Sequence, residues 1–230
     1  IADFTELRND KLEGDLRMGF IRKVYGILSA QLLLTTLFVV IGVTSTGFQE
    51  SIAENFWVFI LAFLGAISCM IALFCCRNLA RRVPHNYILL TGFTACEALM
   101  VACICAFYDP ISVLIAAVMT LSVTLTLTVY ALTTKSDFST KLGMMFVVMV
   151  SLVLFAIFFP IFFNSRLVQV IICVIFVIVY GIYLVIDTQL VAGGGRYKLS
   201  TEDYILGALA IYIDIIGLFL YLLRLFGNRR

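Results

Sequence analysis

The sequence predicts an all-α polytopic membrane protein, and three observations support that prediction. Hydrophobic residues make up 63% of the 230 residues, charged residues make up 13%, and the mean hydropathy is +1.10. A soluble domain of this size has too little interior to bury so much apolar surface. The apolar residues also fall into seven runs of about 20 residues, and each run is long enough to cross roughly 30 Å of hydrocarbon as a helix. The connections between the runs are short and polar, so we expect one domain.

The seven runs follow a charged segment at the N-terminus. Residues 1–23 hold five basic and five acidic side chains, and we expect a cytosolic lead-in here, which a helix lying on the membrane surface would suit. Because the first residue is Ile rather than Met, we expect the native start to lie upstream. The single seven-helix domain then covers residues 24–227. Its spans are expected at residues 24–46, 55–76, 86–107, 111–133, 142–163, 167–191 and 204–226.

Small side chains recur every four residues in three of these spans. Gly26 and Ala30 lie in the first span, and Ala62 and Ala66 lie in the second. The fourth span carries Ala116, Thr120, Thr124 and Thr128. Such ridges let a neighbouring helix approach closely, so we predict helix-packing faces at these positions and assign them no other function.

The cysteines and the single histidine predict neither a disulfide framework nor a zinc site. The seven cysteines lie inside or at the ends of apolar runs and none has CxxC spacing, so we expect buried, reduced thiols. Cys75 and Cys76 end the second span, which leaves lipidation open as an alternative. One histidine, His85, cannot build a His-rich zinc site.

The basic residues predict a cytosolic N-terminus. Twelve of them lie in the N-terminal segment and in the loops after spans two, four and six, whereas one lies in the loops after spans one, three and five. Arg224, Arg229 and Arg230 would lie on the opposite side if the last run crosses the membrane. The length of that run favours a full crossing, and a re-entrant segment is the alternative.

Three acidic residues lie at membrane depth: Glu97 in span three, Asp187 in span six and Asp214 in span seven. No lysine or arginine lies well inside any span. A carboxylate in hydrocarbon costs a few kcal/mol on insertion scales, so such residues usually serve a function. The acidic interior suits a cation or proton path. For each of these acids alone, Asp187 and Asp214 included, the alternative is a protonated carboxyl that is hydrogen-bonded to a neighbouring helix.

The two aspartates lie on consecutive spans and could form one site. Two charges about 4 Å apart repel by about 4 kcal/mol at an effective dielectric constant near 20. If Asp187 and Asp214 meet, we therefore expect them to share one proton, to titrate as a unit and to act as a pH sensor. Arg77, at the cytosolic end of span two, is the best-placed basic latch for this pair. Glu202, just before the last span, is expected either to serve in a helix cap or to attract cations at a pore mouth.

Five stretches, in order along the chain, resemble the transmembrane Bax-inhibitor-motif family in its Lifeguard branch. They are FIRKVY at 20–25, NYILLTGFT at 86–94, KSDF at 135–138, IDTQL at 186–190, and STEDYILGAL continuing to YIDII over 200–216. The resemblance runs from about residue 17 to about residue 227. It implies seven helices, with the last helix central to two three-helix layers.

The resemblance also implies a function. Members of the family are expected to be pH-sensitive calcium leak channels of intracellular membranes (Golgi, endoplasmic reticulum or lysosome) that lower luminal calcium and protect against apoptosis. By position, Asp187 and Asp214 match the pH-sensing dyad on the calcium path, Arg77 the latch and Glu202 the acid at the pore mouth. Glu97 resembles an intramembrane acid of Golgi-resident relatives, without a role that carries over. The implied partners are the lipid bilayer, calcium as the transported ion and apoptosis-regulating proteins, with no cofactor and no nucleic acid.

Three other functions compete with this prediction. An intramembrane aspartyl protease also uses one aspartate on each of two adjacent spans, but it needs Gly-x-Gly before the second. Here Ile211, Tyr212 and Ile213 precede Asp214, and no proline follows Pro160, so we expect no enzyme. A proton-coupled calcium exchanger and a non-conducting anti-apoptotic interaction protein remain as alternatives.

Overall fold

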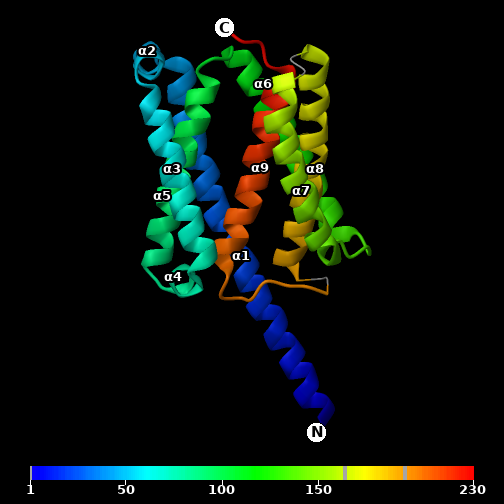
Figure 1. Cartoon of the computed structure of the whole chain (residues 1–230). Helices are drawn as coiled ribbons and strands as arrows, with labels where there is room; N and C mark the ends of the chain where they lie inside the picture. The colour runs from blue at the N-terminus through cyan, green and yellow to red at the C-terminus, as the bar shows by residue number, and fades with distance from the viewer. Residues whose placement is uncertain (1, 163–164, 194–195) are drawn as a thin grey trace.

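The computed structural model describes residues 2–162, 165–193 and 196–230, and over these residues the chain forms a bundle of helices (Figure 1). Its long helices are α1 (Ala2–Thr44), α3 (Phe56–Cys75), α5 (His85–Cys105), α6 (Pro110–Thr133), α7 (Leu142–Phe162), α8 (Arg166–Ala192) and α9 (Tyr204–Phe226). Its short helices are α2 (Thr46–Glu54), α4 (Arg77–Arg81) and η1 (Ser139–Lys141). Among the described residues, six helices are long and apolar enough to cross a membrane, and a shorter apolar stretch, Ser139–Phe155, covers η1 and most of α7. The predicted all-α polytopic membrane fold is confirmed.

Helix α9 lies at the centre of the bundle. Helices α1, α3 and α5 lie on one side of it, and α6, α7 and α8 lie on the other (Figure 1). Of the candidate spans, α9 is the most buried. Its fully buried side chains include Ile205, Leu209, Tyr212, Leu218 and Leu223. A helix that is apolar on nearly all sides can be buried from every direction in such a central place.

Ordinary sequence signals set the helix ends. Pro110 is the first residue of α6, where its missing N–H costs nothing. The Ser165 hydroxyl caps α8 by accepting a hydrogen bond from the Val168 N–H at 3.3 Å. Helix α8 stops at Gly193, whose φ of 76° is readily adopted only by glycine. The turn at Gly193 starts the connection that brings α9 back through the bundle.

The bundle has two distinct ends. Helix α4 and the projecting N-terminal part of α1 lie at one end, and α2 and the C-terminus lie at the other (Figure 1). We call these the α4 end and the α2 end. Helix α9 runs from the α4 end to the α2 end as one helix of 23 residues, which agrees with a full crossing and not with a re-entrant segment.

The predicted boundary at residue 23 is not a break in the structure. Helix α1 is continuous from Ala2 to Thr44, and its first part projects from the bundle along the direction of the span instead of forming a separate segment (Figure 1). The physical reason is that no proline interrupts this part of the chain. Gly14 and Gly19 each cost a helix only about 1 kcal/mol.

The predicted packing ridges are correct in part. Ala62 and Ala66 are buried, as are Ala116 and Thr120, but Gly26 and Ala30 are exposed. The close approach of α1 is instead at Gly42, where an added Cβ would lie 2.7 Å from the carbonyl oxygen of Ala102 on α5. All seven cysteines are free thiols, and Cys75 and Cys76 are exposed, contrary to the expectation of burial.

Candidate functional site

The structure brings the two aspartates of the last two spans together. Asp187 lies on α8 and Asp214 on α9, these helices pack against each other, and the two carboxyl groups form a side-chain hydrogen bond. An ionised carboxylate can only accept hydrogen bonds, so this contact requires a proton on one of the two groups. Among the described residues, no N–H or O–H group donates to the buried Oδ2 atom of Asp214. The hydrogen bond between Asp187 and Asp214 therefore depends on the proton that the two carboxyl groups share.

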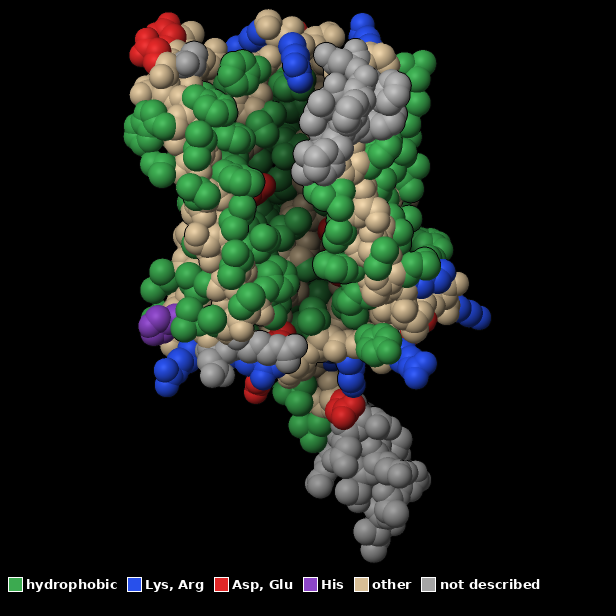
Figure 2. Space-filling view, viewed as in Figure 1, with side chains coloured by type: hydrophobic (Ala, Val, Ile, Leu, Met, Phe, Trp, Pro, Cys, Tyr) green, Lys and Arg blue, Asp and Glu red, His purple; other side chains and the backbone are tan. Residues whose placement is uncertain are grey.

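A tyrosine lies near both this pair and the third interior acid. Tyr180 of α8 lies within electrostatic range of both Asp214 and Glu97. Its ring lies directly on Gly217 of α9, where any Cβ would overlap it. Figure 2 shows a groove between the two halves of the bundle, with acidic surface inside it. Glu97 on α5 is half-buried and takes part in none of the salt bridges of the described residues.

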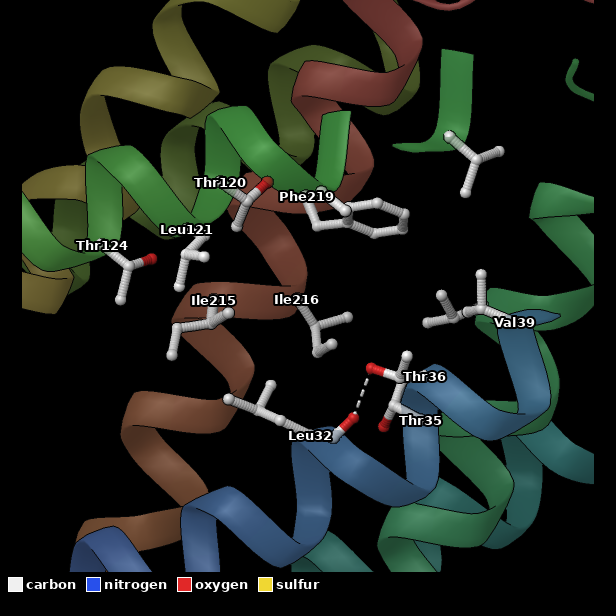
Figure 3. A pocket seen from close by; sticks show the side chains of 13 residues that line it. Leu32, Thr35, Thr36, Val39, Thr120, Leu121, Thr124, Ile215, Ile216 and Phe219 are labelled. Atoms are coloured by element: carbon white, nitrogen blue, oxygen red, sulfur yellow. Dashed lines mark hydrogen bonds between the residues drawn. The ribbon is translucent and has the colours of Figure 1, made fainter. Parts of the chain in front are cut away.

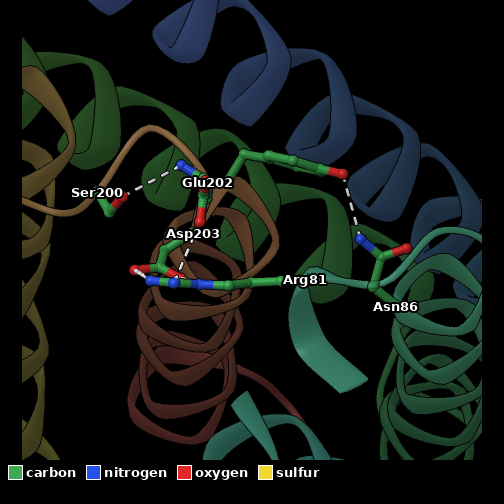
Figure 4. Close-up of polar contacts among 6 residues, drawn as sticks. Arg81, Asn86, Ser200, Glu202 and Asp203 are labelled. Carbon is green, nitrogen blue, oxygen red and sulfur yellow. Dashed lines mark hydrogen bonds and ion pairs between the residues drawn. The ribbon is translucent and has the colours of Figure 1, made fainter. Parts of the chain in front are cut away.

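The arginine and the acid predicted at the mouth lie at the α4 end. Arg77 is the first residue of α4, and its side chain lies outside the described part of the structure. Glu202 is exposed and paired: its Oε2 atom lies 3.1 Å from Nη1 of Arg81. Arg81 also donates from Nε and Nη2 to both carboxylate oxygens of Asp203, at 2.8 and 3.0 Å (Figure 4). These hydrogen bonds raise the pKa of Arg81 above its ordinary value. We call the contacts of Arg81 with Glu202 and Asp203 the Arg81 clasp, and this clasp ties α4 to the start of α9.

A pocket beside α9 suits an ion less well than the acid pair. It has a volume of about 310 Å³ and lies between α1, α5, α6 and α9 (Figure 3). Its polar groups are hydroxyls: Thr35 shares a 2.8 Å hydrogen bond with Tyr212, and Thr36 donates to the Leu32 carbonyl. None of the described residues that line it is charged. Among the described residues there is also no cluster of three or more His, Cys, Asp or Glu side chains that could hold a metal ion.

The comparison with known proteins gives the family. The profile of the family described as "Inhibitor of apoptosis-promoting Bax1" matches residues 17–230. The chain belongs to this family. Protein lifeguard 3 of Homo sapiens is 34% identical over 217 residues, which is 93% of this chain and 70% of that protein. Protein lifeguard 3 of Mus musculus is 32% identical with the same coverage. Protein lifeguard 4 of Mus musculus is 34% identical over 209 residues, which is 91% of this chain and 84% of that protein. The Bax-inhibitor-motif assignment and its Lifeguard branch are confirmed.

In this Lifeguard-like chain, Arg17 positions the helix that carries Asp187, although the sequence alone did not single it out. The guanidinium of Arg17 on α1 donates to the carbonyl oxygens of Leu190 at 2.6 Å, Ala192 at 3.3 Å and Leu199 at 2.6 Å. These groups lie at or just beyond the C-terminus of α8, where carbonyls lack helical partners and a cation is favoured. Arg17 thus fixes the end of the helix that carries Asp187. The only sequence signal was a basic residue before the first span and a glycine stop after the sixth.

Proposed function

We propose that this chain is a pH-sensitive calcium leak channel of intracellular membranes that lowers luminal calcium and protects cells against apoptosis. The observation that carries the proposal is the hydrogen-bonded carboxyl pair, Asp187 and Asp214, inside an apolar bundle. The description of the family by inhibition of apoptosis supports the protective part. The proposal includes residence in the Golgi, endoplasmic reticulum or lysosome and a cytosolic N-terminus, which places the α4 end in the cytosol.

The shared proton is the proposed gate. While the two carboxyls share it, their hydrogen bond holds α8 against α9. When it leaves, two carboxylates about 4 Å apart repel by about 4 kcal/mol at an effective dielectric constant near 20. Separation of the pair, with Arg77 as the compensating cation, then opens a path on which calcium neutralises both charges. Glu202 would attract calcium at the cytosolic mouth. Because Glu202 pairs with Arg81, this attraction would be strongest when the Arg81 clasp is open.

The test is calcium efflux from liposomes that hold the purified protein, measured over a series of pH values. Asp187→Asn and Asp214→Asn keep the side-chain shape and remove the titrating group, so each should flatten the pH dependence of the flux. Asp109→Asn is the matched control, because it makes the same change in a half-exposed acid at the α2 end. If the pH dependence of both interior variants equals that of the wild type, the proposed gate is wrong.

The same preparation separates the two alternatives. A proton-coupled exchanger would drive calcium against its own gradient when a proton gradient is imposed, whereas a leak channel would not. A non-conducting interaction protein would give no flux above that of empty liposomes at any pH.

A further inference from the structure

A second feature, separate from the acid pair, lies at the α2 end of the bundle. A pocket of about 600 Å³ opens between α2, the start of α3, the end of α5 and the C-terminal residues. Its apolar wall is formed by Ile52, Phe56, Phe59, Ile104 and Phe107. Two arginines, Arg229 and Arg230, line its other side. Apolar wall and cationic rim together select a ligand that has both a hydrocarbon part and a negative charge.

Backbone hydrogen bonds hold the C-terminal residues in place against the connection between α5 and α6. The Asp109 N–H donates to the Asn228 carbonyl at 3.0 Å, and the Arg230 N–H donates to the Phe107 carbonyl at 3.0 Å. Tyr108 and Arg229 form an antiparallel bridge within this pairing. Main-chain contacts therefore set the position of the two arginines without using their side chains.

The guanidinium groups use little of their hydrogen-bonding capacity. Each carries five N–H donors. Arg229 donates once, from Nε to the Tyr108 hydroxyl at 3.4 Å. Arg230 donates to Oε1 of Gln49 at 3.4 Å and lies 3.7 Å from the Asp109 carboxylate. Among the salt bridges of the described residues, none involves Arg229, so its charge has no acidic partner there.

The pocket lies at the ends of the candidate spans α3 and α5, so we expect it at the depth where phospholipid headgroups meet hydrocarbon. Phe56 and Trp57 start α3 beside it and are 66% and 59% exposed. Exposed aromatic side chains at the end of a span are typical of the membrane interface. In the proposed topology the α2 end lies away from the cytosol, whereas basic residues prefer the cytosolic side. A bound anion would offset the charge of the arginines at this end.

We propose that this pocket binds an anionic phospholipid, with its phosphate at Arg229 and Arg230 and an acyl chain along Phe59 and Ile104. Guanidinium groups bind phosphate oxygens through paired, charge-assisted hydrogen bonds. The apolar wall gives the acyl chain a surface that a free phosphate ion could not use. This inference does not depend on calcium conduction.

The single tryptophan supplies the measurement, because Trp57 lies next to Phe56 of the pocket wall. The protein is placed in bilayers of phosphatidylcholine that contain increasing fractions of brominated phosphatidylglycerol or, in parallel, brominated phosphatidylcholine, which quench tryptophan fluorescence on contact. We expect the brominated anionic lipid to quench Trp57 at lower fractions than the brominated neutral lipid. The double variant Arg229→Gln/Arg230→Gln should reduce this preference about three- to tenfold.

Two further variants make the result specific. Arg166→Gln removes one positive charge at the same end of the bundle from a residue that does not line the pocket, and it should keep the preference. Ile104→Trp fills the pocket while both arginines remain; because it adds a second tryptophan, its lipid preference is read from native mass spectra of the purified protein with each lipid, where retention of phosphatidylglycerol should fall. Circular dichroism checks that every variant keeps the helical fold of the wild type.

Three results would overturn the proposal. The first is equal quenching of the wild type by both lipids. The second is a loss in Arg166→Gln as large as that in the double variant, which would indicate general surface attraction. The third is displacement of the brominated anionic lipid. Displacement by millimolar inorganic phosphate would assign the pocket to a soluble anion, and displacement when the protein dimerises would assign it to a second copy of the chain.

Discussion

Gln189 on α8 holds the connection between α6 and α7 with both ends of its side-chain amide. Its Oε1 accepts a hydrogen bond from the Phe138 N–H at 2.8 Å, and its Nε2 donates to the carbonyls of Ser136 at 2.9 Å and Ala131 at 3.4 Å. Gln189→Leu keeps a similar volume and leaves these three backbone groups without the amide. A buried polar group without a partner costs about 1–3 kcal/mol. Since water can reach part of this connection, we expect the free energy of unfolding to fall by about 2–4 kcal/mol in total.

Gln31→Leu is the matched control, because the wild-type side chains are similarly buried, with exposed fractions of 4% for Gln31 and 6% for Gln189. Gln31 donates only to the Thr94 hydroxyl at 2.9 Å, and that hydroxyl keeps its own bond to the Leu90 carbonyl. Among the described residues, the Oε1 atom of Gln31 has no partner, so leucine removes an unpaired polar atom there. We expect a loss below about 1 kcal/mol.

Both free energies can be measured by equilibrium unfolding in mixed micelles, with helical circular dichroism recorded as the fraction of denaturing detergent rises. The comparison tests whether the cost follows the number of backbone groups left without a partner. If both variants lose the same amount, or if Gln31→Leu loses more, this explanation of the cost is refuted.

Two further outcomes are expected. In the same unfolding assay, Gly42→Ala should lower the free energy of unfolding by about 1–3 kcal/mol, because its Cβ would lie 2.7 Å from a backbone oxygen of α5. Gly26→Ala should raise the free energy of unfolding by about 0.5–1 kcal/mol, because nothing lies within 4 Å of the added Cβ. Changes of the same sign in both variants would contradict this packing. Hydrogen bonds from Ser139 and from the Arg196 N–H lower the pKa of Asp137 below its ordinary value. The hydrogen bond that links Asp137 to the α8–α9 connection is therefore fully present above the unfolded-state pKa. It is lost only as the pH falls through the lower folded-state pKa. Hydrogen exchange of the Arg196 amide, corrected for its intrinsic rate, should therefore stay slow down to about pH 4 and speed up below it, and Asp137→Ala should remove the protection at all pH values.

The sequence was sufficient for the fold class and for the acid pair, for simple physical reasons. Span length is fixed by bilayer thickness, so apolar runs can be read directly. A carboxyl inside such a run is costly, and that cost made Asp187 and Asp214 stand out. Their meeting required only that consecutive spans pack side by side.

Contacts between distant segments were beyond the sequence. Arg81 meets Asp203 across 122 residues of chain, and Arg17 meets Leu199 across 182. Their partners are set by which helices neighbour one another, and single-chain periodicity does not encode that. The small-residue ridge at Gly26 failed for the same reason, because spacing identifies a face without saying whether a helix or lipid covers it. Opposite charges at the ends of α4 and α9, both predicted to be cytosolic, were the one signal that could have identified Arg81.

The unbroken path of α1 has a mechanical consequence. A helix transmits rotation along its axis, and each residue step corresponds to about 100° of turn. A rotation of the projecting arm by a single step would therefore swing the Arg17 guanidinium away from all three carbonyls that it holds. A molecule that grips the arm outside the bilayer would in this way exert torque on the end of α8, five residues from its aspartate.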